Sequence, residues 1–474
     1  MKMSLTYQLL NTKPDKMYNK FFHLILIAGL ACLFSGCKKD LDLRPTDTVD
    51  PSKAYTNVKD ITAGLYSVYA GNSNANRIYL GTILADEAKL SDENRGQGQF
   101  QFKWQYTASN YPAGMGQYYS MIDQVHRILD AYPGITAANA TEESTKTRIK
   151  GELIALRGIA YLELLINFMP QGYDPAALAV PLVLKSDLLQ KPARNTVQEI
   201  MTQIESDLAA GRSETLIPNS PDDPLRLSHS AIAAYQARAA LLRKDWDKAI
   251  TYATEAITLS GKTLNMVEFP GYFTDDNESE TIFKYRNNTA PQTLWRDTNG
   301  DVFFEPADKL KNLFDRTSDI RFSTFFGSAG EDTSIVTKYP GSSRGPQIND
   351  LKLIRLAEMY LIRAEAYAEK SQLTDAANDI NTLRRQRITG YADVAFASKD
   401  IAISEILDER FKELCYEGFR FFDLKRRNMG INRNASDSRN ANWQNLAADS
   451  YLFALPIPQS EFSGNPNMVQ NPGY

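Results

Sequence analysis

The sequence feature that most constrains the fold is a pair of segments, 228–261 and 357–387, each with two helical patterns separated by a short polar break. Small and apolar residues recur in both segments at the three- and four-residue spacing of a helix face. Small side chains at this spacing let two helices cross closely, so each segment predicts an antiparallel helix pair. The positions that define the pairs are Ala237, Ala240, Ala253 and Ala256 in the first segment, and Ala364, Tyr367, Ala376, Ile380 and Leu383 in the second.

The register of both pairs matches that of a tetratricopeptide repeat, but the pairs lie much farther apart than the repeat length of about 34 residues. The sequence therefore predicts a mainly α-helical, tetratricopeptide-like scaffold with large irregular insertions that form a ligand-binding face. An Ala-rich helical hairpin that is no true repeat is the alternative. Further helices are expected over 50–71 with Asp50 as N-cap, over 146–168, and over 196–211, which opens with a capping box at Thr196.

The N-terminal region has the pattern of a targeting signal. The apolar run FFHLILIAGLACLF follows basic residues and precedes the stretch SGC, which ends at Cys37. A basic start, a short apolar core and small residues before a cut site are typical of a secretory signal, and the run is too short for an ordinary membrane-spanning helix. Because SGC resembles a bacterial lipobox, we expect a signal peptide over 1–36, a lipid anchor at Cys37 and an extended tether over 37–50. Either Met1 or Met17 can be the first residue of the translated chain. The alternative to a lipidated Cys37 is a buried cysteine within a signal anchor.

Composition and motif content exclude several classes of function. A net charge of −4 and a pI near 5.7 argue against a nucleic-acid-binding surface, which is normally basic. His126 and His229 lie far apart, and neither they nor the three cysteines stand in a metal-binding or nucleophile motif. The sequence thus predicts a protein that is not an enzyme, with no catalytic residue, metal or cofactor. A carboxylate pair for glycoside hydrolysis stays open, with Asp86, Glu87, Asp92 and Glu93 as candidates.

Two insertions, 71–119 and 264–348, combine aromatic residues with Asn, Gln, Asp and Arg and lack helical periodicity. Such a mixture suits a sugar ligand, because pyranose rings stack on aromatic faces while their hydroxyls need side chains that donate and accept hydrogen bonds. The alternative is that each ring only packs within its own insertion, and Trp246 and Trp443 are expected to be structural. The predicted stacking residues are Trp104, Tyr106, Tyr272 and Trp295, and the predicted polar contacts are Asp86, Arg95, Asn110 and Arg296.

The stretch 403–428, ISEILDERFKELCYEGFRFFDLKRRN, resembles the C-terminal signature of the SusD/RagB family. The lipobox, the stretch LRGIAYLELL and the chain's last residues resemble the same family. Residues 51–474 are accordingly expected to form one SusD-like body, with 350–474 as its C-terminal family region. The charged residues of the signature recur three or four residues apart and are expected to form ion pairs along one helix; they are Arg410, Glu413, Glu417, Arg420 and Asp423.

The resemblance implies a lipid-anchored outer-membrane protein of Bacteroidetes that faces the cell exterior. Members of this family have an α-helical body with four tetratricopeptide-like units. They bind glycans without cleaving them and deliver the captured oligosaccharide to a partner TonB-dependent transporter. Two other functions are left open by the residues themselves. One is a helical scaffold that binds a protein or peptide, and the other is a surface glycoside hydrolase.

Overall fold

The computed structural model describes residues 54–71, 75–187, 189–286, 295–297, 299–329, 334–346 and 348–474. The chain divides into two units, Met1–Ala54 and Tyr55–Tyr474, and all that follows concerns the second unit. The expected signal peptide, lipid anchor and tether therefore lie outside the described residues. In the described part of the chain, no helix combines the length and the apolar character that crossing a bilayer requires.

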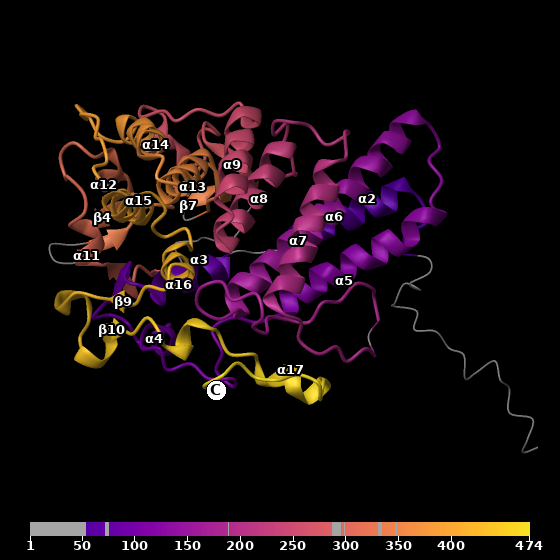
Figure 1. Ribbon diagram of the computed structural model, residues 1–474, viewed down its shortest axis with the longest axis horizontal. Coiled ribbons are helices and arrows are strands. Elements are labelled where there is room, and N and C mark those ends of the chain that lie inside the picture. Colours follow the sequence, from indigo (N-terminus) through magenta and orange to yellow (C-terminus); the bar gives the residue numbers. More distant parts are fainter. Residues whose placement is uncertain are drawn as a thin grey trace, which may run out of the picture. The chain divides into compact units, whose positions relative to one another are not determined.

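Four long helices form the N-terminal part of the second unit: α2 (Val58–Ala70), α5 (Gly116–Ala131), α6 (Ala140–Phe168) and α7 (Val197–Arg212) (Figure 1). Helices α6 and α7 cross closely where glycines face each other. A Cβ atom added at Gly211 would lie 2.7 Å from the Cβ of Ala155. Since that distance is shorter than real Cβ contacts, a larger residue at this position would push the two helices apart.

Both helix pairs predicted from the sequence are confirmed. The first consists of α8 (His229–Arg243) and α9 (Trp246–Ser260), and the second of α13 (Leu356–Glu369) and α14 (Leu373–Arg385). Helix α9 packs against α13, so the two pairs form one continuous stack although insertion residues separate them in the sequence (Figure 1). The small residues that predicted the pairs are buried: Ala237, Ala240, Ala253, Ala256, Ala364 and Ala376.

The helix ends follow local capping, and two of them differ from the sequence-based prediction. Helix α2 begins after Asn57, whose side chain accepts from the Asp60 N–H, while Asp50 lies outside the described residues. Helix α6 begins at Ala140 and not at residue 146, because Asn139 caps it. The capping box at Thr196 is confirmed, with both reciprocal hydrogen bonds present.

The connecting segments contain short helices and five two-stranded antiparallel sheets among the described residues. The strand pairs are β1–β3, β2–β8, β4–β5, β6–β7 and β9–β10. The short elements are α3 (Ala75–Ile83), β1 (Ala88–Leu90), α4 (Gln99–Phe102), η3 (Tyr132–Gly134), α10 (Phe269–Tyr272), β2 (Thr281–Tyr285), β3 (Phe304–Pro306), α11 (Asp308–Lys311), α12 (Ile320–Phe325), β4 (Phe326–Ser328), β5 (Ser334–Val336), β6 (Gly341–Ser342), β7 (Gly345–Pro346), β8 (Leu351–Arg355), β9 (Ile431–Asn432), η5 (Ala435–Asp437), η6 (Ala441–Trp443), β10 (Asn445–Leu446), η7 (Tyr451–Phe453) and α17 (Gln459–Gly464).

The charged signature does not form a ladder of ion pairs along one helix, which corrects the sequence-based expectation. It spans α15 (Lys399–Glu413), a tight turn and α16 (Arg420–Arg426). Within the turn, Tyr416 and Gly418 both have positive φ angles, of 60° and 84°. Because the helix ends before this turn, Glu413 and Glu417 pair with residues from other parts of the chain, while Asp423 pairs with Arg410 across the turn.

Glu413 is the centre of a buried ion-pair cluster. Its carboxylate accepts from Arg321 Nη1 at 3.1 Å, from Arg355 Nη1 at 3.0 Å and from Arg387 Nη2 at 3.0 Å. Glu417 adds ion pairs to Arg355 and to Lys338. Burial alone would raise the pKa of Glu413, but the three guanidinium groups outweigh it and hold the pKa well below its ordinary value.

Replacing Glu413 by Gln tests how strongly the fold depends on this cluster. The substitution leaves three buried arginines short of one negative charge, so we expect the free energy of unfolding to fall by about 3–5 kcal/mol. Urea denaturation followed by circular dichroism would measure the loss. Glu405→Gln is the matched control. Glu405 lies on the same helix and also pairs with an arginine, Arg384, but its side chain is 43% exposed, so its loss should cost less than about 1 kcal/mol. Equal losses of unfolding free energy in the two variants would contradict the special dependence of the fold on the Glu413 cluster.

Candidate functional site

The two insertions lie side by side. Strand β1 of the first insertion pairs with β3 of the second, with Leu90 opposite Phe304. Beyond the strands, the N–H of Ser91 donates to the Phe303 carbonyl at 3.2 Å. The Val302 N–H donates to Glu93 Oε2 at 2.6 Å. These contacts place the loop after β1 directly beside the segment that precedes β3.

The segment before β3 is a tight hairpin. The N–H groups of Phe303 and Phe304 both donate to the Trp295 carbonyl, and the Asp297 side chain accepts from the Asp301 N–H at 2.9 Å. Arg95 of the first insertion extends across to this hairpin, where its Nη2 lies 2.9 Å from Asp301 Oδ2. The exposed side chains of both insertions therefore share one surface.

A third segment, from the C-terminal region, completes this surface. Arg433 is buried, and its guanidinium donates to the carbonyls of Ala85, Phe102 and Trp443. Burial lowers the pKa of Arg433 to about 9. Since these carbonyls belong to the first insertion and to the C-terminal loop, one arginine fixes both segments in place.

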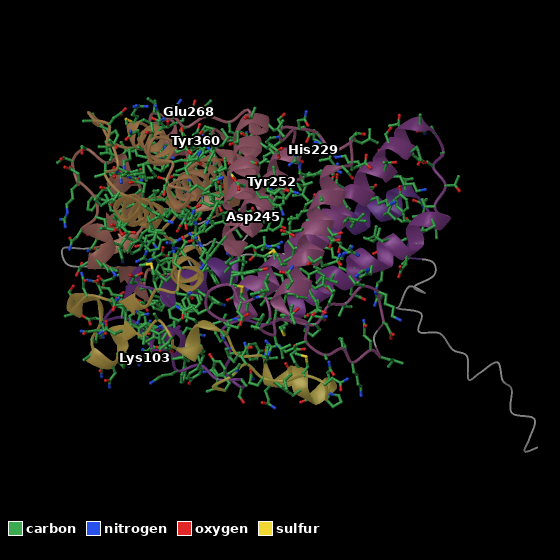
Figure 2. All side chains as sticks on the ribbon, viewed as in Figure 1. Lys103, His229, Asp245, Tyr252, Glu268 and Tyr360 are labelled. Atoms are coloured by element: carbon green, nitrogen blue, oxygen red, sulfur yellow. The ribbon has the colours of Figure 1, made fainter. Side chains whose placement is uncertain are left out.

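We define the insertion surface as the exposed and partly exposed residues of 92–103, 296–297, 299–302 and 439–443. Phe100 is 54% exposed on the short helix α4. Lys103 lies at the lower edge of the molecule in Figure 2, with its ammonium 4.4 Å from the ring centre of the partly exposed Trp443. Apolar ring surface, amides and charged groups are thus combined on one face.

The structure places the predicted stacking residues in the core, and this corrects the expectation that their rings face a ligand. Trp104 is only 7% exposed, donates from Nε1 to the Leu84 carbonyl and has the Arg433 guanidinium 4.2 Å from its ring. Tyr106 is buried as well, and its hydroxyl donates to the Leu452 carbonyl.

The two candidates from the second insertion are also buried. Trp295 is 2% exposed and packs edge-on against Tyr416 at 5.6 Å between ring centres. Tyr272 is fully buried, with the Lys352 ammonium 5.3 Å from its ring centre. The physical reason is the same for all four rings. Segments without long helices have few other large apolar groups, so their aromatic residues form the core.

The predicted polar residues divide into buried and surface groups. Asp86 is buried and bound by the Arg420 guanidinium and the Lys309 ammonium. Burial would raise the pKa of Asp86, but these two cations hold it well below its ordinary value. Arg95 and Arg296 belong to the insertion surface, while Asn110 is exposed on a separate turn and lies outside it.

Phe100 and Trp443 are the aromatic residues of the insertion surface, and the sequence analysis did not select them. Phe100 stands between Gln99 and Gln101 in a stretch of Gly and Gln, a context that favours exposure. The stretch is too short to show helical periodicity, so this signal was weak. Trp443 lies in the C-terminal tail, which only the tertiary fold brings beside Lys103.

Both halves of the chain match protein-family models. A model described as "SusD family" matches residues 333–474, and one described as "Starch-binding associating with outer membrane" matches residues 38–241. The chain belongs to the SusD/RagB family. The C-terminal match includes Glu413 and residues 439–443, and the N-terminal match includes the whole first insertion. Residues 296–297 and 299–302 of the insertion surface lie between the two matches.

Individual relatives agree with the SusD/RagB assignment. SusD-like protein P38 of Formosa agariphila is 24% identical over 88% of this chain and 93% of its own length. The starch-binding protein SusD of Bacteroides thetaiotaomicron is 33% identical over 35% of this chain and 28% of its own. A Bacteroides vulgatus protein described as sugar-binding has a similar crystal structure, with a TM-score of 0.79, 25% identity, and coverage of 89% of this chain and 100% of its own. A SusD superfamily protein from Bacteroides thetaiotaomicron has a TM-score of 0.79 at 24% identity, over 88% of this chain.

Trp104→Ala and Phe100→Ala distinguish core rings from surface rings. Removing the buried Trp104 leaves a cavity, so we expect the free energy of unfolding to fall by about 3–5 kcal/mol. Removing the exposed Phe100 should change it by less than about 1 kcal/mol. Urea denaturation of both variants tests the assignment, and a large loss for Phe100→Ala would contradict it.

The buried carboxyl of Glu87 makes the stability of the folded protein depend on pH. Its carboxyl is buried and accepts from the Tyr416 N–H at 3.2 Å, and burial raises its pKa from 4.5 to about 8. Between these values the folded chain holds a proton that the unfolded chain releases. The contribution of Glu87 to stability is therefore complete below pH 4.5 and is lost as the pH rises through 8.

Glu87→Gln should remove this dependence. We expect the stability of the native protein relative to the variant to fall steadily as the pH rises from 4.5 to 8. Urea denaturation at several pH values would measure it. Asp92→Asn, at a side chain that is 99% exposed, serves as control and should show no such trend. A flat difference for Glu87→Gln would show that this carboxyl is already ionised in the folded state.

Proposed function

We propose that this protein is a cell-surface lipoprotein that captures an oligosaccharide and delivers it to a partner TonB-dependent transporter of the outer membrane. The observation that supports this most is the insertion surface, where Phe100 and Trp443 stand among amide and charged side chains. The family description of starch binding with outer-membrane association supports it too, as do the names of the relatives.

The chemistry of the insertion surface suits binding rather than cleavage. Its rings offer apolar faces for pyranose stacking, and its Asn, Gln and Arg side chains can bind hydroxyls. The carboxylates of Asp92, Glu93 and Asp301 are already bound by Arg439, by the Val302 N–H and by Arg95. Asp86 and Glu87 are buried against the signature turn. No free pair of carboxylates is therefore evident among these residues, which argues against glycoside hydrolysis.

Retention of the protein by polysaccharides in native gels tests the proposal. The lipid-free chain from residue 38 would be run through gels that contain plant, fungal or host polysaccharides. One class of glycan should retard it, and Phe100→Ala combined with Trp443→Ala should abolish most of the retardation, because each stacked ring contributes about 0.5–1.5 kcal/mol beyond its buried area.

Tyr66→Ala is the matched control for this experiment. Tyr66 is also an exposed aromatic residue, at 51%, but it lies on α2 and is not part of the insertion surface, so retardation should persist. The double variant should still co-purify with the transporter, which separates glycan binding from partner binding. If no glycan retards the protein and a peptide binds instead, the glycan proposal fails and the protein-binding scaffold replaces it.

The lipid anchor can be tested apart from ligand binding. Two acyl chains hold a protein stably on a membrane, whereas one gives only marginal attachment. Cys37→Ser should therefore shift the protein from the membrane fraction to the soluble fraction of a Bacteroidetes host, and Cys32→Ser should leave it membrane-bound. Retention of the Cys37 variant in the membrane fraction would contradict lipidation at this position.

A further inference from the structure

A groove of about 450 Å³ lies between α5, residues 181–187 and 190–192, and the C-terminal segment 459–468. Helix α17, one of its walls, lies at the lower edge of Figure 1. The volume falls within the range of roughly 300–1,000 Å³ that is usual for small-molecule sites. None of the residues that line the groove belongs to the insertion surface, so the groove is a separate feature of the molecule.

The walls of the groove are held in place by side-chain hydrogen bonds to backbone groups. Tyr119 on α5 donates to the Pro181 carbonyl at 2.7 Å. Asn465 donates to the Pro192 carbonyl at 2.7 Å, and Asn467 donates to the Lys191 carbonyl at 2.6 Å. The groove is therefore pre-formed, and a ligand would not have to order its walls.

Several polar side chains of the groove form neither a hydrogen bond nor an ion pair with other described residues. They are the exposed hydroxyls of Ser120 and Ser460 and the partly exposed carboxylate of Glu461. Glu461 is half-buried, and burial raises its pKa. A partly desolvated carboxylate without a donor is unfavourable, and a ligand that donates a hydrogen bond to it would relieve that cost.

The charges of the groove discriminate between classes of ligand. The Asp123 carboxylate is already bound by Arg127 Nε at 2.7 Å and by Ser186 Oγ at 2.6 Å. Lys185 lies 3.9 Å from Asp187, which leaves Glu461 as the lining charge without a counterion among the described residues. Anionic ligands would be repelled by this surplus. A neutral ligand with hydroxyl groups would find acceptors in Glu461 and the serines.

We propose that this groove is a second saccharide site, which takes one or two neutral pyranose rings and rejects uronic or sulfated ones. The inference rests on the proposed function as a glycan-binding protein and adds a site to it. Tyr119, Val183 and Pro192 are partly exposed and form the apolar side that meets the carbon-bound hydrogens of a ring. Glu461, Ser120 and Ser460 bind the hydroxyls.

Saturation-transfer difference NMR on the lipid-free chain tests the groove with defined probes. Maltose, cellobiose and N-acetylglucosamine represent neutral sugars, and glucuronic acid represents anionic ones. At least one neutral probe should show transfer while glucuronic acid shows none. Glu461→Ala should weaken binding of that probe roughly tenfold, the loss expected for one hydrogen bond to a charged group.

Ser120→Trp fills the groove and should abolish binding of the neutral probe. Ser463→Trp is the matched control, because Ser463 is exposed on the same helix as Glu461 but does not line the groove, and binding should persist. Equal binding of glucuronic acid, or full binding by the Ser120 variant, would overturn the inference.

The same measurements distinguish failure of the groove proposal from failure of the proposed function. Phe100→Ala with Trp443→Ala should leave the NMR signal of the groove unchanged. Failure of every neutral probe, in a protein that polysaccharide gels still retard, would overturn the groove and leave the proposed function intact. If no polysaccharide retards the protein and no neutral probe binds, both the groove proposal and the proposed function are overturned.

Discussion

Glu413 lies among Arg321, Arg355 and Arg387, which come from segments far apart in the chain. A carboxylate removed from water is tolerated only when cations and hydrogen bonds replace its hydration, and here three guanidinium groups do so. These arginines belong to α12, to the end of β8 and to the residues after α14. The cluster therefore fixes the second insertion and the second helix pair around the end of α15, and the signature turn begins from that fixed point.

The signature turn, between α15 and α16, connects the Glu413 cluster to the first insertion. Gly418 has a φ of 84°, and a Cβ atom added at Gly81 of α3 would lie 2.6 Å from its Cα, so the two backbones touch. Only glycine combines this conformation with so close an approach. Arg420, at the start of α16, binds Asp86, and the Tyr416 N–H of the turn donates to Glu87. Two residues shortly after α3 are therefore held by the turn and by the helix that follows it. The site is thus supported by the same charges that were expected to stabilise only a helix.

The helix pairs could be predicted from the sequence because their signal is local: small residues at helical spacing have one favourable packing. Exposure of the aromatic residues could not be predicted in this way. Phe100 and Phe102 stand two residues apart in one short helix, yet the first is exposed and the second is fully buried. The group that covers Phe102 is Arg433, whose guanidinium lies 3.7 Å from the ring centre and comes from a residue 331 positions later. Neither spacing nor composition contains that information. Counting aromatic residues therefore led to two of the three segments of the insertion surface but favoured the larger rings, which the insertions use as their core.

The burial of those rings explains how irregular segments can present a fixed binding surface. A loop without long helices would lose conformational freedom on binding, and that loss opposes affinity. Here the loop carbonyls are held by Arg433, and the Asp437 carboxylate accepts from the N–H groups of Asp308 and Lys309. Trp104 and Trp295 pack beneath the same segments. The residues that cannot touch a ligand thus hold the exposed Phe100 and the partly exposed Trp443 in position, so that the proposed sugar ligand would not first have to order this shallow surface.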